Sequence, residues 1–498
     1  MQTLGEVLEA SKHLYPQRIA VEREGERLTY DQLFSQVLYA ARQLEAMQLT
    51  TESVVALLFQ NTPTALVSFL ALAWLGIGTI PLDPNLPVHE LETIQQQIDF
   101  RTIIGDQASL TKLQPVFTRC NLINSDTLLP TGDASSMGPP TEPVRNAEAT
   151  FLYHFTSGST GVPKAALHSQ ENLVNGATIY QQTYHVTSED TLFVPIPLYH
   201  SFGMIAGFIT SLLCGARLVL NSRFIPTQIA SIIGEQQVTL FLATPMIYDL
   251  VARCALRTMP DTQALRYCLS SGSTLSPETE KKFSARFGRA VYSVYGCTEV
   301  GIIASRWGEG FDWPEQATGH PVVGVQARIV DDQGRDVPAG NEGALLVKTP
   351  AMFRGYYEHA EATQRAFLDG WYVTGDLARQ DKQGYLYLIG RKDTFINVGG
   401  KKVNPAEVES VLLAHPKVKE AIVFGRQIPN MGESVHAAVV LHEDIANDEL
   451  IAFCRQHLTS YKVPAHIHVY QEFARTSLGK IRRAHYTNAE EHTSISRA

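Results

Sequence analysis

Residues 54–82, VVALLFQNTPTALVSFLALAWLGIGTIPL, contain the pattern that decides the fold class. The apolar run 54–59 is followed by Thr62-Pro63, which is typical of a helix start, and Gly76 and Gly78 are placed to end that helix. Residues 79–82 are apolar again, so the stretch predicts strand, helix, strand. It carries no charged residue, but its apolar centre at 65–75 is too short to cross the ~30 Å core of a bilayer. We therefore predict a buried βαβ unit and no membrane span.

The same alternation of strands and helices continues along the chain. A buried helix is expected over residues 202–213, ending at Gly215. Further strands are expected at residues 191–196, 216–220, 239–242 and 266–270. Strands that alternate with helices predict parallel sheets covered by helices on both faces.

From residue 327 the pattern changes to shorter apolar runs separated by turn signals such as Asp-Gly and Gln-Gly, which predicts a small antiparallel or barrel-like section. Its strands are expected at residues 327–330, 344–347, 371–373 and 385–388. Near the end of the chain, helices are expected at 406–414 and 448–458, and strands at 421–424 and 435–440. Residues 130–146, rich in Pro, Ser and Gly, are interpreted as a surface loop. The predicted class is α/β, with a large N-terminal domain of parallel-sheet subdomains plus a β-barrel-like part, and a small α/β C-terminal domain.

Length and composition indicate a globular, enzyme-sized protein of several domains. The 498 residues carry 41 basic and 50 acidic side chains, a formal net charge of −9. No basic stripe is present, so we expect no nucleic-acid partner. The six cysteines are dispersed without a CxxC pair, which argues against a disulfide framework or a zinc site. Together with an N-terminus that does not have the pattern of a signal peptide, this predicts a cytoplasmic location.

The first segment with a chemical signature lies between an expected strand at 149–155 and an expected helix that begins near Lys164. Small hydroxyl residues and glycines there allow backbone N–H groups to approach an anion, and a lysine adds positive charge. The spacing is not that of a Walker A loop, and a flexible Ser/Gly linker is the alternative interpretation. The candidate anion-binding residues are Thr156, Ser157, Gly158, Ser159, Thr160, Gly161 and Lys164.

Two further segments gain meaning only in combination. In Tyr295-Gly296-Cys297-Thr298-Glu299, a Thr hydroxyl beside a Glu suits a phosphate contact next to a Mg²⁺ ligand, although the segment alone also suits an ordinary turn. Lys480 follows a glycine in a basic tail, where a lysine is usually a solvated surface charge.

Taken in order, these segments resemble the motifs of the acyl-adenylate-forming superfamily, which includes acyl-CoA synthetases, standalone adenylation domains and luciferases. The resemblance covers nearly the whole chain. Its motifs are residues 28–33, 76–83, 156–164, 197–203 (PLYHSFG), 295–299, 353–357 (FRGYY), 372–377 (YVTGDL), 390–393 (GRKD), 404–409 (NPAEVE) and Lys480.

The resemblance implies an AMP-binding domain at residues 1–390, a hinge at 391–394 centred on Asp393, and a mobile C-terminal lid at 395–498. It implies that ATP and Mg²⁺ are used to convert a carboxylic acid to acyl-AMP with release of pyrophosphate. Lys480 would bridge the carboxylate and the α-phosphate, Thr298 would contact that phosphate, and Glu299 and Thr160 would hold Mg²⁺. The implied adenosine contacts are Gly272, Ser273, Tyr295, Gly296, Asp376 and Arg391.

The resemblance also implies a second step, in which a thiol attacks the acyl-AMP. Gly399 and Gly400 would line the channel for the pantetheine arm, although a plain turn is the simpler interpretation of two glycines. His200, Phe202 and Gly203 would form or gate the acyl pocket, and His200 is equally well explained as a packed loop histidine.

An apolar or aromatic carboxylic acid joined to coenzyme A is the leading expectation, because the pocket motif has no carboxylate to pair with an α-ammonium. Such an enzyme would serve fatty-acid or aryl-acid metabolism, as a monomer or homodimer. A separate carrier protein with a phosphopantetheine arm, or an amine, is the alternative acceptor. A non-catalytic acyl-AMP-binding regulator is less favoured, because Lys480, Glu299 and Asp376 are all present.

Overall fold

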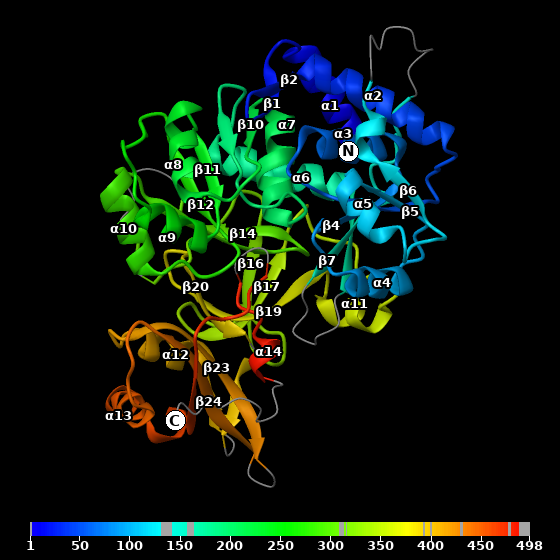
Figure 1. The fold of residues 1–498 in the computed structure, drawn as a ribbon. Coiled ribbons are helices and arrows are strands. Elements are labelled where there is room, and N and C mark those ends of the chain that lie inside the picture. Colours follow the sequence, from blue (N-terminus) through cyan, green and yellow to red (C-terminus); the bar gives the residue numbers. More distant parts are fainter. Residues whose placement is uncertain are drawn as a thin grey trace. The chain divides into compact units, whose positions relative to one another are not determined.

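A computed structural model describes residues 2–130, 142–156, 164–307, 313–314, 316–391, 394–398, 401–428, 432–476 and 480–487 (Figure 1). The chain divides into two compact units. Unit 1 comprises residues 1–327 and 347–372, and unit 2 comprises residues 328–346 and 373–498. The chain therefore passes from one unit to the other three times. The expected hinge residue Asp393 lies outside the described residues, and a domain boundary near residue 390 stays a prediction.

Unit 1 contains a nine-stranded sheet in the order β15-β14-β13-β12-β11-β9-β10-β1-β2. The strands from β1 through β10, β9, β11 and β12 to β13 pair in parallel, and the edge strands β2, β14 and β15 pair antiparallel. Its strands are β1 (Ile19–Arg23), β2 (Glu26–Thr29), β9 (Thr191–Phe193), β10 (Arg217–Leu220), β11 (Leu240–Ala243), β12 (Tyr267–Ser270), β13 (Val291–Cys297), β14 (Gly301–Ser305) and β15 (His320–Pro321). The predicted strands of this region are confirmed.

A six-stranded sheet, ordered β6-β5-β3-β4-β7-β8, forms the other part of unit 1. Neighbouring strands in this sheet pair in parallel, except that β7 pairs with β8 in antiparallel fashion. Its strands are β3 (Val54–Leu58), β4 (Gly78–Leu82), β5 (Thr102–Gly105), β6 (Asn121–Asn124), β7 (Thr150–Thr156) and β8 (Lys164–Ser169).

Helices cover these sheets, as Figure 1 shows. In α3 (Pro63–Leu75) the Thr62 side chain caps the first turn, and Gly76 ends the helix at φ 69°. Residues of α3 are buried all round, which confirms the predicted βαβ unit. The other helices that the structure describes in unit 1 are α1 (Leu4–Leu14), α2 (Tyr30–Ala46), α4 (Val88–Gln97), α5 (Gln107–Leu113), η1 (Ser125–Leu128), α6 (Gln170–Tyr184), η3 (Phe202–Ile209), α7 (Thr210–Cys214), α8 (Pro226–Glu235), α9 (Pro245–Arg253), α10 (Pro277–Phe287) and α11 (Ala360–Ala366).

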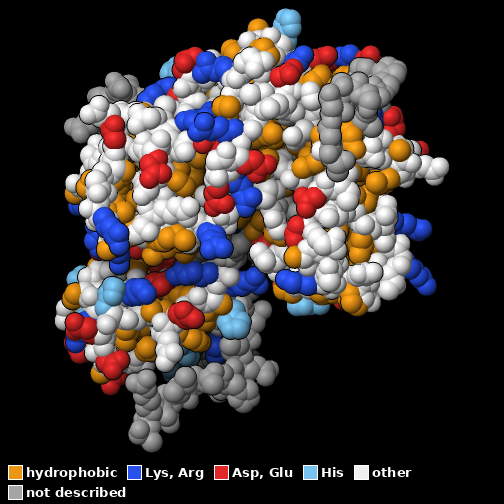
Figure 2. Space-filling model, turned by 45° about the horizontal axis from the view of Figure 1, so that its top comes forward, with side chains coloured by type: hydrophobic (Ala, Val, Ile, Leu, Met, Phe, Trp, Pro, Cys, Tyr) orange, Lys and Arg blue, Asp and Glu red, His pale blue; other side chains and the backbone are white. Residues whose placement is uncertain are grey.

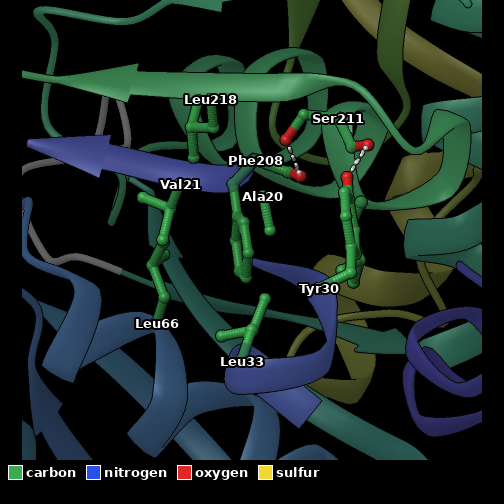
Figure 3. A pocket seen from close by; sticks show the side chains of 9 residues that line it. Ala20, Val21, Tyr30, Leu33, Leu66, Phe208, Ser211 and Leu218 are labelled. Carbon is green, nitrogen blue, oxygen red and sulfur yellow. Dashed lines mark hydrogen bonds between the residues drawn. The ribbon is translucent and has the colours of Figure 1, made fainter. Parts of the chain in front are cut away.

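The buried helix predicted over 202–213 is confirmed, but its first part, η3, has π-helical geometry and only α7 is α-helical. Gly215 ends it in the left-handed conformation, with φ 71°. A cavity of about 10 Å³ lies beside η3, lined by Phe208 and by apolar side chains of the first strand and of α2 and α3 (Figure 3). The Tyr30 hydroxyl at its rim lies 2.9 Å from the Ser211 carbonyl oxygen. A space of this size and lining is a small packing gap, too small for a substrate.

The turn-rich section forms a five-stranded sheet in the order β16-β17-β19-β18, with β20 paired to β19. Its strands are β16 (Gln326–Val330), β17 (Glu342–Lys348), β18 (Phe367–Leu368), β19 (Trp371–Gln380) and β20 (Leu386–Arg391). A second five-stranded sheet, in unit 2, comprises β21 (Ile396–Val398), β22 (Lys401–Val403), β23 (Val418–Ile428), β24 (Gly432–Leu441) and β25 (His466–Tyr470). It packs with α12 (Pro405–Leu413) and α13 (Asn447–His457) around one apolar cluster, and η5 (Ser460–Lys462) and α14 (Ala484–Thr487) complete unit 2.

None of the helices formed by described residues combines the length and the apolar character needed to cross a membrane. On the face of unit 1 visible in Figure 2, acidic and basic side chains are interspersed among apolar and neutral ones. On this face, charged side chains of both signs are therefore distributed over many separate positions.

Candidate active site

The candidate site in unit 1 lies at the carboxyl ends of β9, β11, β12 and β13, which are parallel neighbours. From β9 the chain continues to β10 on one side, whereas β11 is followed by β12 on the other side. Open α/β sheets bind ligands at such a point of reversal, outside the carboxyl ends of the strands. The segments that emerge there are residues 194–200, Thr244, residues 271–273 and residues 295–299.

The Tyr295–Glu299 motif forms the closing end of a β-hairpin between β13 and β14. Cys297 pairs with Gly301, and residues 298–300 make the turn. Gly296 is required by this packing, because a Cβ there would lie 2.2 Å from the Gly301 carbonyl oxygen. Gly301 itself has φ 72°. The hairpin therefore presents Thr298 and Glu299 together at its tip.

Glu299 is 8% exposed and is held by two contacts. The Tyr356 hydroxyl donates to Glu299 Oε1 at 2.9 Å. The Phe353 N–H donates to the Glu299 carbonyl oxygen at 2.7 Å. Lys164 Nζ lies over the Tyr356 ring, 5.6 Å from its centroid. Lys164 and Glu299, two charged candidate residues that are distant in the sequence, thus both contact the Tyr356 side chain.

Thr156 and Lys164 form the last register pair of β7 and β8, and the Thr156 hydroxyl donates to the Lys164 carbonyl oxygen at 3.4 Å. The loop between them holds candidate residues that lie outside the described part of the chain: Ser157, Gly158, Ser159, Thr160 and Gly161. The helix predicted to begin near Lys164 is wrong, because residues 164–169 form β8. Pairing with β7 outweighs the helix propensity of this segment, and α6 begins only after the capping residue Ser169.

Gly272 and Ser273 follow β12. The Ser271 hydroxyl donates to the Val294 carbonyl oxygen at 2.9 Å, which ties the loop to the neighbouring strand β13. Gly272 has φ 98°, a conformation that favours glycine, and its Cβ position would lie 3.6 Å from Thr244 Cγ2. Ser273 is exposed.

The loop that carries His200 is anchored by the six-stranded sheet. The Asn61 side chain donates to the Ile196 carbonyl oxygen at 2.8 Å and accepts from the Leu198 N–H at 2.9 Å. The Tyr199 hydroxyl donates to Asp83 at 2.7 Å. Asn61 and Asp83 come after the carboxyl ends of β3 and β4 in the six-stranded sheet. Their side chains therefore hold the loop that follows β9 of the nine-stranded sheet.

A third anchor is His154 on β7, whose Nε2 lies 2.8 Å from the Tyr199 carbonyl oxygen. Burial lowers the pKa of His154 to about 4, against the smaller opposing effect of this hydrogen bond. Burial, followed by the charge of His154, lowers the pKa of His168 on β8 to about 3. Both imidazoles are therefore neutral near pH 7.

Phe202 and Gly203 begin η3. A Cβ on Gly203 would lie 2.7 Å from the Pro197 carbonyl oxygen, so closure of the loop onto η3 requires glycine there. The ring centroid of Phe202 lies 6.5 Å from that of Tyr180 on α6. These contacts give both residues a packing role in addition to the predicted pocket role.

In unit 2, Asp376 and Arg391 form a register pair across β19 and β20. Arg391 Nη1 lies 4.0 Å from Asp376 Oδ1. Gly375, which directly precedes Asp376 in β19, has φ 77°, and a Cβ there would lie 3.0 Å from Arg391 Nη2. The Asp376 N–H donates to the Thr374 hydroxyl at 3.0 Å.

Lys480, also in unit 2, is exposed and precedes Ile481, which forms an isolated bridge with Arg475. Its N–H donates to the Thr476 hydroxyl at 3.2 Å, and its carbonyl oxygen accepts from the Thr476 N–H at 2.8 Å. Gly399 and Gly400 lie outside the described residues.

The structure thus brings Lys164, Thr298 and Glu299 to one edge of unit 1, and pairs Asp376 with Arg391 in unit 2. Sequence reasoning did not identify Tyr356, Asn61, Asp83 or His154 as site residues. Tyr356 and Asp83 lie within the motifs 353–357 and 76–83, but the sequence did not indicate what either side chain does. Asn61 and His154 lie in none of the motifs, so nothing in the sequence was a reason to select them. Among the described residues, no group of three or more His, Cys, Asp or Glu side chains is arranged to hold a metal ion.

Comparison with known proteins gives likenesses over the whole chain. The profile of the family described as AMP-binding enzyme matches residues 8–357, and that of the AMP-binding enzyme C-terminal domain matches residues 407–480. The chain is 29% identical to the oxalate–CoA ligase of Arabidopsis thaliana, over 97% of each protein. It is also 29% identical to the medium-chain fatty-acid–CoA ligase of Escherichia coli K12, over 97% of this chain and 89% of the relative. The structure of o-succinylbenzoate CoA synthetase from Bacillus subtilis, in complex with its acyl-adenylate intermediate, superposes with a TM-score of 0.86 and 27% identity, over 98% of this chain and 99% of that chain.

Proposed function

Because this chain belongs to the AMP-binding enzyme family, we propose that it is an AMP-forming carboxylic acid–CoA ligase. The proposal rests on one observation: Lys164 and Glu299 both contact Tyr356, at the edge of unit 1 where the parallel strands have their carboxyl ends. This arrangement supplies one cation and one cation ligand where a polyphosphate would bind. Both relatives are CoA ligases, and the similarity covers 97% and 89% of their own lengths, which supports the same activity for this chain.

The reaction has two steps. A carboxylate oxygen of the acid attacks the α-phosphorus of ATP, the bond to the bridging oxygen breaks, and acyl-AMP and pyrophosphate form. The thiol of coenzyme A then attacks the acyl carbon and displaces AMP, leaving the thioester. Negative charge grows around the α-phosphate in the first step, so the protein has to direct cations and hydrogen-bond donors there.

We assign these tasks by the family motifs. Lys480 bridges the carboxylate and the α-phosphate, and Thr298 donates to that phosphate. Lys164 contacts the β- and γ-phosphates, together with the loop of residues 157–161 and the adjoining Thr156. Positive charge at these points is needed because the chain as a whole is acidic.

The adenosine half of the nucleotide is assigned to other residues. Asp376 accepts from the ribose hydroxyls, with the Arg391 guanidinium beside it at 4.0 Å. Tyr295 stacks on the adenine, and Gly272, Ser273 and Gly296 border it.

The residues of the hairpin tip fit Mg²⁺. Magnesium is commonly bound by one or two carboxylates together with substrate phosphates and water, and Glu299 offers a carboxylate of fixed orientation. Thr160 is proposed as a further ligand. Bound Mg²⁺ would neutralise charge on the β- and γ-phosphates.

For the second step we propose a hinge at Asp393 between an adenylation domain (residues 1–390) and a lid (395–498). The pantetheine arm would pass Gly399 and Gly400. The acceptor is coenzyme A; a carrier-protein arm or an amine is the competing possibility. A cytoplasmic monomer or homodimer is proposed.

The acid is proposed to be apolar or aromatic. The loop that carries His200 presents no carboxylate between residues 198 and 203, while Phe202 and Gly203 provide an apolar surface at the start of η3. The characterised relatives act on acids as different as oxalate and medium-chain fatty acids, so the family alone does not select one.

The test is pyrophosphate release over a panel of aliphatic, aromatic and dicarboxylic acids with MgATP. The best acid is then offered coenzyme A, a holo-carrier protein or an amine, and products are identified by mass. We expect acid-dependent pyrophosphate release and an acyl-CoA product. Absence of pyrophosphate release with every acid would reject the ligase activity, and a product formed only with the carrier or the amine would reject the acceptor.

A further inference from the structure

Tyr356 is the residue on which the two charged groups of the phosphate side converge. Its hydroxyl donates to Glu299 Oε1 at 2.9 Å, and its ring lies under Lys164 Nζ at 5.6 Å. Glu299 follows β13 and Lys164 opens β8, so the two residues come from different sheets. A single side chain therefore fixes where an anionic and a cationic group lie relative to one another.

The backbone of Tyr356 is itself held firmly. It forms an isolated bridge with Ala166 on β8, and its N–H donates to the Thr363 hydroxyl at 2.9 Å. The preceding Gly355 has φ 133°, and a Cβ there would lie 2.7 Å from Thr363 Cγ2. The Phe353 ring contacts the Tyr356 ring edge-on, with centroids 4.9 Å apart. These contacts leave the phenol little freedom to turn away from Glu299.

The hydroxyl is placed to act as a donor, because the Glu299 carboxylate oxygen only accepts and the phenol supplies the proton of the 2.9 Å hydrogen bond. With Oε1 accepting this proton, the orientation of the carboxyl group toward a cation is defined.

We propose that Tyr356 is the positioning residue of the magnesium–triphosphate site, directing Glu299 toward the cation through its hydroxyl and Lys164 toward the phosphates through its ring. This inference rests on the proposed function for the identity of the ligand, MgATP. It assigns to Tyr356 no contact with the substrate.

The test uses Tyr356→Phe in the full chain, which removes the hydroxyl and keeps the ring under Lys164. The control is Tyr357→Phe, which removes the hydroxyl of the next residue; that side chain packs against Tyr153 and touches neither charged group. Two quantities are measured: the affinity for MgATP and for ATP in EDTA by calorimetry, and the Mg²⁺ concentration that gives half-maximal pyrophosphate release.

For Tyr356→Phe we expect the MgATP affinity to fall about tenfold, as for loss of one hydrogen bond to a charged group, and the Mg²⁺ half-saturation to rise equally. Binding of ATP in EDTA should change less than twofold, and so should kcat at saturating Mg²⁺. A purely structural role would instead weaken binding with and without Mg²⁺ to the same extent. Tyr357→Phe should match the wild type in every measurement.

A second variant, Tyr356→Leu, removes the ring as well. It should additionally weaken ATP binding in EDTA by a few-fold, because the contact under Lys164 is lost. Mg²⁺ half-saturation and MgATP affinity within twofold of wild type in Tyr356→Phe would overturn the inference. If the wild type binds MgATP but releases no pyrophosphate with any acid, the proposed function fails, while the calorimetric comparison still decides the role of Tyr356.

Discussion

Acidification should destabilise unit 1 through two buried histidines, His154 and His168. Burial lowers the pKa of His154 from 6.5 to about 4, and that of His168 to about 3. In the unfolded chain both imidazoles bind a proton near pH 6.5, whereas in the folded protein they remain neutral until the pH is far lower. The unfolded state therefore binds more protons as the pH falls below 6.5, and the free energy of unfolding decreases.

The size of the effect follows from the two shifts. One pKa unit corresponds to ~1.4 kcal/mol, so each histidine should lower the free energy of unfolding by about 2 kcal/mol between pH 7 and pH 5. The pair should cost about 4 kcal/mol over the same interval, a large fraction of the stability of an ordinary domain. The loss should continue below pH 5 and end near pH 4 for His154 and near pH 3 for His168.

Urea unfolding followed by tryptophan fluorescence measures this directly, because all four tryptophans belong to unit 1. The matched variant is His154→Gln, whose amide can still donate to the Tyr199 carbonyl oxygen but does not titrate. Between pH 7 and 5 the variant should lose about 2 kcal/mol less stability than the wild type. Parallel pH profiles for the two proteins would refute the reasoning, since they would mean that His154 is protonated as easily in the folded as in the unfolded chain.

Three further predictions concern the proposed reaction. Lys480→Ala should reduce acyl-AMP formation by about 100-fold or more and spare thioester formation from supplied acyl-AMP; equal loss in both assays would contradict its assigned role. Glu299→Gln should raise the Mg²⁺ half-saturation of pyrophosphate release about tenfold, and an unchanged Mg²⁺ titration would exclude it as a ligand. Asn61→Ala removes both hydrogen bonds to the His200 loop, so the KM for the acid should rise about tenfold with that for ATP unchanged; equal changes in both would show a general loss of structure.

Local pattern was sufficient to predict most of the elements in unit 1. The helix within residues 54–82 could be predicted because its capping threonine, first-turn proline and terminal glycine are all encoded within that stretch. The π-helical geometry of η3 could not be predicted, because it does not alter the apolar pattern from which the helix was inferred. The helix predicted near Lys164 was wrong because the local pattern misled: residues 164–169 are mostly good helix formers, but pairing with β7 holds them as a strand.

The candidate site was predictable to the extent that its residues lie in continuous motifs. Thr298 and Glu299 share one hairpin tip, so five consecutive residues were enough to mark them. Tyr356 is 57 positions from Glu299 in the sequence, and Asn61 is more than a hundred from the loop that it anchors. Contacts of that kind depend on how two sheets are arranged, which no local period or spacing encodes.

The three crossings of the chain between its two units set limits on any dissection of this protein. A fragment that starts at residue 391 would lack residues 328–346 and 373–390, which belong to the same compact unit. All three crossings fall inside strands, β16, β17 and β19, so cleavage there would cut a hydrogen-bonded ladder as well as a connection. A lid expressed alone should therefore begin before β16 or be circularly permuted.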